Sequence, residues 1–293
     1  MDVQLGLLLN AVLSGMLLGG FYAGVSVGVA IAFGMLDVVN IAHPAFIVLG
    51  AFVTFMLNDR FGIDPVVAGV LATPLFFAGG AALYEFYYRA FERHDNTALR
   101  GLAFFFGILF ITEVALVLIF GVDYRTVSAP YIGPSLHLGI IDLPLRMIVP
   151  CAAALAMVAV LQRFLTHSFT GRAIQAVSQD RVALQLMGVS PRRIKRLAFG
   201  LSVATAAVAG ALLIIIQPVE PSIGRDYVGR TFAIVVMGGM GSFPGMVLVA
   251  MILGVMESLT ATFFDPSWAT AVAFGFLLPT LAIRSSGLLG RRV

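Results

Sequence analysis

Long apolar runs alternate with short polar or basic stretches along almost the whole chain. A helix that spans a membrane needs about 20 apolar residues, and short spans go down to about 17. The pattern predicts nine hydrophobic segments: residues 5–33, 45–57, 66–84, 101–120, 146–161, 197–216, 228–237, 246–262 and 268–283. The first segment is too long for one upright helix. The second and the seventh are too short for a full span.

The same pattern decides the fold class. Transmembrane β-strands alternate polar and apolar residues, whereas these runs are apolar throughout, so helices are predicted. Composition agrees, because 60% of the 293 residues are hydrophobic and 11% are charged, whereas about a quarter are charged in soluble domains. We therefore expect an all-α fold, a polytopic transmembrane helical bundle of eight or nine segments. Some of these segments are discontinuous, and all belong to a single domain over residues 1–293.

Basic residues gather on one side of the predicted bundle. The loops around Arg89, between Arg163 and Arg196, and after Arg284, together with Arg100, hold 13 of the 18 Lys and Arg residues. Cytoplasmic loops carry an excess of these residues. We therefore expect these loops and the C-terminus to be cytoplasmic. Because the nine predicted segments are an odd number, the N-terminus is then expected on the opposite side, outside the cell.

Two stretches interrupted by glycine or proline occupy the two halves of the chain. One is FGMLDVVNIAHPAFIVLG at residues 33–50, and the other is VMGGMGSFPGMVLVAMILG at residues 236–254. Each predicts an apolar helix, a break closed by a proline, and a second apolar helix. Paired interrupted helices are typical of transporter binding sites. Each stretch is also compatible with an ordinary short loop at the membrane face.

Polar and glycine residues in these breaks form the candidate substrate pathway: Asp37, Asn40, His43, Gly238, Gly239 and Gly241. Ionisable residues at membrane depth are costly, which makes them functional candidates. Asn40 fits two roles equally, capping the broken helix or contacting substrate. His43 does not by itself predict a metal site, because no further ligand recurs at a suitable spacing.

Two further carboxylates fall deep inside predicted spans. Glu113 lies in the fourth segment and Glu257 in the eighth. For both we favour a structural role, an interhelical hydrogen bond, over contact with substrate.

The basic segment between the fifth and sixth spans carries a helical pattern of its own. Apolar and small residues recur in it at helical spacing: Ala173, Ile174, Ala176, Val177, Ala183, Leu184 and Met187. Gly188 is placed to end the helix in a left-handed cap, and Ser190 and Pro191 are placed to begin the next span. The apolar face of the predicted helix fits a lipid surface or a groove on another protein. Its alanines and Asp180 favour the groove.

Three blocks together resemble the permease subunits of ABC importers for branched-chain amino acids, over residues 15–290. NIAHPAFIVLG, which begins at Asn40, resembles that family's Asn-x-Ala-His-Gly-Glu region. Residues 171–188 resemble its cytoplasmic coupling loop, and GGMGSFPGMVLVAMILGVMESL, which begins at Gly238, resembles its late glycine block. One departure bears on the substrate. Pro44 and Ala45 follow the histidine where the family commonly has Gly and Glu.

The resemblance implies a single transmembrane permease domain with a cytoplasmic coupling loop at about residues 163–196. The residues expected to couple it to ATP-binding ABC subunits are Gly171, Arg172, Ala176, Asp180, Ala183 and Gly188. The other partners implied are a second permease subunit, usually a different chain, an extracytoplasmic substrate-binding protein and membrane lipid, without nucleic acid. The implied location is the bacterial inner membrane, and the implied substrates are branched-chain or related amino acids.

The chain is not expected to be an enzyme or to hold a cofactor. A P-loop needs a lysine after its glycine, and the one lysine of this chain, Lys195, follows Ile194. A separate ATPase must then supply the energy. The alternative is an ion-coupled secondary transporter, which would use Asp37, Glu113 and Glu257 but would leave the coupling-like loop unexplained. No Ser/His/Asp grouping or HExxH motif supports an intramembrane enzyme.

Overall fold

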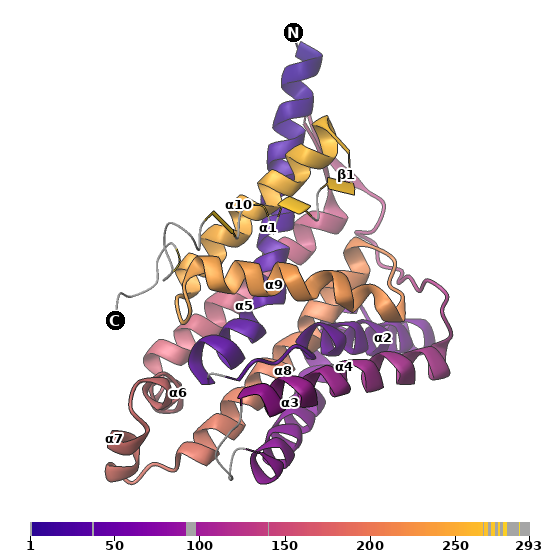
Figure 1. Ribbon diagram of the computed structural model, residues 1–293. Helices are drawn as coiled ribbons and strands as arrows, with labels where there is room; N and C mark the ends of the chain where they lie inside the picture. Colours follow the sequence, from indigo (N-terminus) through magenta and orange to yellow (C-terminus); the bar gives the residue numbers. More distant parts are fainter. Residues whose placement is uncertain are drawn as a thin grey trace.

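The computed structural model describes residues 2–36, 38–91, 98–139 and 141–265, together with residues 267–268, 271–272, 275, 278–279 and 287. Asp37 lies outside the described residues, as does most of the last predicted span. The described part is largely helical, as the hydrophobic pattern predicts (Figure 1).

Seven helices of the described part are long and apolar enough to cross a membrane. They are α1 (Asp2–Leu36), α2 (His43–Phe61), α3 (Pro65–Ala90), α4 (Ala98–Phe120), α5 (Leu145–His167), α8 (Pro191–Ile216) and α10 (Phe243–Phe263). The shorter elements are α6 (Phe169–Gln179), α7 (Arg181–Leu186), α9 (Gly224–Gly238), the 3-10 turn η2 (Pro221–Ile223) and the strands β1 (Ser135–Leu138) and β2 (Ile141–Pro144). This is the polytopic helical bundle expected from the sequence.

The first predicted segment forms one unbroken helix, α1. At 1.5 Å per residue, its 35 residues extend to about 50 Å, well beyond the about 30 Å of hydrocarbon in a bilayer. The helix must therefore tilt or project from the membrane, and Figure 1 shows its amino end beyond the other helices. The seventh predicted segment forms α9, which is short as expected and lies across α1 (Figure 1).

Both interrupted stretches are helix–break–helix units, as predicted. Residues 38–42 are not helical and separate α1 from α2, which has Pro44 in its first turn. Residues 239–242 separate α9 from α10, which has Pro244 in its first turn. A proline fits the first turn of a helix because its missing N–H would have no partner there.

Helix α8 lies at the centre of the described bundle and packs against α2 and α3. Small residues make these contacts close. A Cβ added at Gly50 of α2 would lie 2.9 Å from the Cα of Ala207, and one at Gly69 of α3 would lie 2.5 Å from the Cβ of Ala211. Lipid tails are as apolar as leucine, so close backbone packing is a main source of helix association in membranes.

Helix α1 packs along α10 in the same way. Gly15 and Gly19 of α1 face Gly254 of α10, and a Cβ at Gly19 would lie 2.6 Å from the Cα of Met251. Larger side chains here would force the two helices apart. This crossing joins the first half of the chain to the second.

Basic residues from two loops meet at one end of the bundle. Glu85, near the end of α3, forms ion pairs with Arg89 of its own helix and with Arg192 and Arg196 at the start of α8. The β1–β2 hairpin lies at the opposite end (Figure 1). The basic residues expected on the cytoplasmic side thus lie together at one end of the bundle. The side of the membrane that each terminus faces stays a prediction.

Candidate functional site

Two of the polar residues predicted to line a substrate path lie in the break after α1 and at the first residue of α2. Asn40 and His43 are 1% and 0% exposed. The side-chain amide of Asn40 makes no hydrogen bond with the described residues. Helix α2 begins at His43, and the residue in the N-cap position is Ala42, which makes no side-chain capping bond. Within the described residues, the Asn40 side chain therefore does not cap α2.

His43 lies where α1, α2 and α8 meet. Its ring packs directly on Gly28 of α1, and the Thr205 hydroxyl of α8 borders the same glycine. The backbone of Val25 is near the ring, but neither ring nitrogen reaches hydrogen-bond geometry with a described residue. Ser202 donates a 2.7 Å hydrogen bond to the Gly28 carbonyl. This helix crossing thus holds a buried polar cluster with unused hydrogen-bonding capacity, which is rare in protein interiors.

The second break depends on its glycines. Gly239 and Gly241 have φ angles of +94° and +83°, which residues with a Cβ rarely adopt. Gly238 packs against the first turn of α10, where a Cβ would lie 2.6 Å from the Met246 nitrogen. A Cβ at Gly34, near the end of α1, would lie 2.7 Å from the Gly241 nitrogen. The end of α1 therefore lies directly against the second break.

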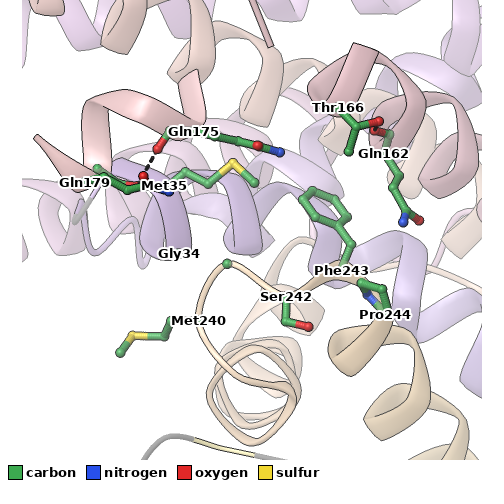
Figure 2. Close-up of a pocket in the computed structure, with 12 residues that line it drawn as sticks. Gly34, Met35, Gln162, Thr166, Gln175, Gln179, Met240, Ser242, Phe243 and Pro244 are labelled. Atoms are coloured by element: carbon green, nitrogen blue, oxygen red, sulfur yellow. Dashed lines mark hydrogen bonds between the residues drawn. The ribbon is translucent and has the colours of Figure 1, made fainter. Parts of the chain in front are cut away.

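A cavity of about 380 Å³ opens beside this second break (Figure 2). Its lining comes from the ends of α1, α5 and α6, from the break and from the start of α10: Gly34, Met35, Gln162, Thr166, Gln175, Ser178, Gln179, Met240, Gly241, Ser242, Phe243 and Pro244. Figure 2 shows the Phe243 ring between Met35 on one side and Gln162 and Thr166 on the other. Among the described residues of the predicted path, Gly241 lines this cavity, and Asn40, His43, Gly238 and Gly239 do not.

The segment predicted as one amphipathic helix forms two, α6 and α7. Asp180 separates them, with an extended backbone (φ −150°) and a carboxylate that accepts hydrogen bonds from the N–H groups of Val182 and Ala183 at 2.8 and 2.9 Å. The prediction of a single helix is wrong because the aspartate that caps α7 also ends α6. Gly188 follows α7 with a φ angle of +78°, as predicted.

The apolar stripe of this segment faces the protein itself. Ile174 and Val177 of α6 and Leu184 of α7 are buried in the core of the bundle. A Cβ at Gly171 would lie 2.5 Å from the Cα of Leu165, so α6 needs this glycine to lie so close to α5. These three residues therefore pack on the bundle and do not cover lipid or fill a partner's groove, whereas Ala183 and Met187 of the same stripe are exposed, so docking through them stays a prediction.

The opposite side of the segment is open. Of the predicted coupling residues, those exposed are Arg172, Asp180, Ala183 and Gly188, and Ala176 is half-buried. Three large apolar side chains, Val182, Leu186 and Met187, are exposed by 66%, 84% and 80%. We call these three residues the α7 surface. An apolar patch outside the spans is typical of a protein contact site.

Sequence reasoning missed that arginines of α9 hold the two deep carboxylates. Arg225 donates to both oxygens of Glu113 at 2.7 and 2.9 Å. Arg230 donates to Glu257 at 3.1 Å, and the Tyr22 hydroxyl donates to the same carboxylate at 2.6 Å. The interhelical bonds expected for these carboxylates are present. No three His, Cys, Asp or Glu side chains gather as a metal site within the described residues.

Comparison with known proteins bears on what this arrangement does. The family described as "Branched-chain amino acid transport system / permease component" matches residues 11–281, which is most of the chain. The chain belongs to this family. The match extends from α1 to beyond α10 and includes both breaks and the α6–α7 segment.

Relatives within this permease family match the chain over almost its full length. The high-affinity branched-chain amino acid transport system permease protein LivH of Escherichia coli (strain K12) is 27% identical, covering 99% of this chain and 98% of the relative. The corresponding BraD of Pseudomonas aeruginosa is 28% identical, covering 97% and 96%. The permease protein LivM of Escherichia coli (strain K12) is 36% identical over 41% of this chain and 28% of its own length. No solved structure matches the chain.

Proposed function

We propose that this chain is the transmembrane permease subunit of an ABC importer that carries branched-chain or related amino acids across the bacterial inner membrane. Membership of the permease family over most of the chain is the observation that carries the proposal. Within the part of the chain that the structure describes, seven helices of membrane-spanning length and composition support the membrane location. The names of the relatives support the substrate class.

A separate ATPase would act on the permease through α6 and α7. Burial of Ile174 and Val177 ties α6 to the bundle, so a force on this segment reaches the spans. The α7 surface would be covered by the ATPase, because apolar side chains gain free energy when they leave water. Asp180 sets the turn between the two helices, and Gly171 sets the distance to α5. The remaining coupling residues in this proposal are Arg172, Ala176, Ala183 and Gly188.

Ion coupling has less support, because two of the three acidic side chains that it would use have arginine counter-ions. Glu113 is held by Arg225, and Glu257 by Arg230. An arginine beside a carboxylate balances its negative charge and so weakens its attraction for a sodium ion. The third candidate, Asp37, lies outside the described residues.

The other partners follow from the transport system to which the relatives belong. Full-length matches to LivH and a local match to LivM support pairing with a second, different permease chain. An extracytoplasmic binding protein would deliver the substrate and set most of its specificity.

The proposed substrate path combines Asp37, Asn40 and His43 with Gly238, Gly239 and Gly241. Buried polar groups without partners cost free energy, which supports a state in which Asn40 and His43 meet substrate or water. Asn40→Ala should reduce uptake while protein level and assembly with the ATPase stay unchanged. Unchanged uptake by a well-expressed variant would remove Asn40 from the path.

The proposed orientation has the N-terminus outside and the α6–α7 segment in the cytoplasm. Single cysteines at Ser135 and Ser178, in a Cys151→Ala background, would be treated with an impermeant thiol reagent in intact cells. Ser135→Cys should be labelled and Ser178→Cys protected. The reverse pattern would invert the orientation.

The proposed function is tested by reconstituting the chain with its co-purified partners in lipid vesicles. Uptake of radiolabelled leucine should require both ATP and the binding protein. A sodium or proton gradient applied without ATP should drive none. Gradient-driven uptake without ATP would favour the ion-coupled alternative.

A further inference from the structure

The crossing of α1, α2 and α8 brings an imidazole and a hydroxyl together and closes around them. A Cβ added at Gly28 of α1 would lie 2.5 Å from Nε2 of His43 and 2.5 Å from the Thr205 hydroxyl oxygen. His43 and Thr205 are 0% and 4% exposed. The imidazole from the first turn of α2 and the hydroxyl from the middle of α8 therefore lie side by side against the α1 backbone, closed to solvent in this conformation.

The groups buried at this crossing keep hydrogen-bonding capacity that the closed packing does not use. Both ring nitrogens of His43, and both amide atoms of Asn40 in the adjoining break, are buried and have no hydrogen-bond partner among the described residues. On α8, Ser202 donates to the Gly28 carbonyl and Thr205 donates to the Ser202 carbonyl, each at 2.7 Å, so the oxygens of both hydroxyls can still accept. Burying a polar group without a partner costs free energy. Four such atoms within four residues of the chain indicate a second conformation in which they have partners.

Helix α8 joins this crossing to the coupling segment. It begins at Pro191, shortly after the turn at Gly188 that follows α7, and continues to Ile216. Thr205 lies 14 residues after Pro191, which at 1.5 Å per residue places it about 20 Å along the helix. Rigid helices carry displacements between distant sites. A movement of α6 and α7 therefore reaches Thr205 through α8, whereas His43 belongs to α2, which begins anew after the break.

We propose that the crossing of α1, α2 and α8 is a substrate-contact site that this conformation holds closed, and that α8 opens it when the coupling segment moves. In the open state Ser202 and Thr205 face the substrate together with His43, so α8 supplies a wall of the path. Hydroxyl, amide and neutral imidazole groups both donate and accept hydrogen bonds, which suits the ammonium and carboxylate groups of an amino acid. This inference rests on the proposed function and adds to it the α8 wall and the movement that opens the site.

The reactivity of an introduced cysteine tests whether the crossing opens. Thr205→Cys in a Cys151→Ala background places a thiol in the crossing, and the complete complex would be reconstituted in the vesicles used for uptake. The rate of reaction with 2-aminoethyl methanethiosulfonate, a small water-soluble reagent, would be measured at rest and during turnover with ATP, binding protein and L-leucine. Val203→Cys is the matched control, because Val203 is also a 4% exposed residue of α8 but packs against Gly80 of α3.

Turnover should speed the labelling of Thr205→Cys at least tenfold and change that of Val203→Cys less than twofold. An equal rise at both positions would show a general loosening of α8 and overturn the proposal. If the labelling rate of Thr205→Cys stays constant while the same vesicles take up leucine with ATP, the inference fails and the proposed function stands. If wild-type vesicles take up leucine only with an ion gradient, the proposed function fails and the inference with it. Should Thr205→Cys fail to assemble or to transport, Ser202→Cys reports the same opening from one turn away.

A zinc bridge tests the closed contact independently. Cysteine sulfur and histidine nitrogen bind Zn²⁺ at about 2.3 Å and about 2.0–2.1 Å, and His43 lies close enough to position 205 for one ion to join them. Micromolar Zn²⁺ should slow uptake by Thr205→Cys at least fivefold, and a zinc chelator should restore it. When Thr205→Cys is combined with His43→Gln, zinc should change uptake, or the labelling rate where uptake is lost, less than twofold. No zinc effect on Thr205→Cys, or an equal effect with and without His43, would overturn the proposal.

Discussion

Replacing Arg230 with methionine should strongly destabilise the bundle. Its guanidinium holds Glu257, and the two side chains are 14% and 3% exposed. Without Arg230, the buried carboxylate keeps the hydrogen bond that the Tyr22 hydroxyl donates at 2.6 Å, but it loses its counter-ion. The arginine also lies 5.9 Å from the Tyr22 ring and 5.5 Å from the Tyr227 ring, so cation–π contacts would be lost as well.

The size of the effect follows from the burial of the pair. Breaking a buried ion pair by removing one partner costs about 3–5 kcal/mol, because the other charge is left unmatched. Arg230→Met and Glu257→Met should therefore each lower the free energy of unfolding by about that amount. Replacing both residues with methionine removes both charges, so the double variant should lie within about 1–2 kcal/mol of the wild type.

The free energy of unfolding would be measured by SDS titration in mixed micelles, followed by circular dichroism. Arg89→Met is the control, since its side chain is 71% exposed and Glu85 keeps Arg192 as a partner, so its loss should cost about 1 kcal/mol or less. If the double variant loses the sum of the two single effects, Arg230 and Glu257 do not act as a pair. ATP-driven uptake by the double variant should persist, whereas an ion-coupled transporter that used Glu257 would lose transport.

Three further substitutions test the local structure. Asp180→Asn should keep the cap of α7 and near-normal uptake, whereas Asp180→Ala should lose most of the ATP-driven uptake. Equal uptake by both would show that the cap does not matter. Asp64→Ala removes the acceptor for the Val66 and Val67 N–H groups at the start of α3. It should lower the free energy of unfolding in the SDS titration by about 1–2 kcal/mol. An unchanged free energy would show that the Asp64 cap does not stabilise α3. Gly19→Leu should lower the free energy of unfolding by about 1–3 kcal/mol, because the larger side chain would force α1 and α10 apart. A stability equal to that of the wild type would disprove this close packing.

The sequence predicts the spans and both breaks because their signals are local. Apolar runs of sufficient length specify membrane helices, and Pro44 and Pro244 mark where the second helix of each stretch begins. The left-handed turn at Gly188 follows from the same kind of local reasoning. These features need no knowledge of which helices are neighbours.

The sequence does not predict the contacts between distant segments. Nothing local shows that Arg225 and Arg230 reach Glu113 and Glu257, since a short basic helix also fits a membrane boundary. The apolar stripe of α6 is visible in the sequence, but its partner is the bundle, which only the assembled fold reveals. The cavity is unpredictable for the same reason, because four separate helix ends form its wall.

We propose that a separate ATPase drives this permease through the α7 surface. The most direct measurement compares Leu186→Glu with Gln185→Glu in reconstituted vesicles, following leucine uptake and substrate-stimulated ATP hydrolysis together. Leu186 is 84% exposed, so the substitution should leave the bundle intact, while a carboxylate buried in an apolar contact would weaken docking by about a hundredfold or more. Leu186→Glu should therefore lose both activities with normal membrane insertion, and Gln185→Glu, which adds the same charge without removing an apolar side chain, should keep both. Normal ATP-driven uptake by Leu186→Glu would show that the ATPase does not act through the α7 surface.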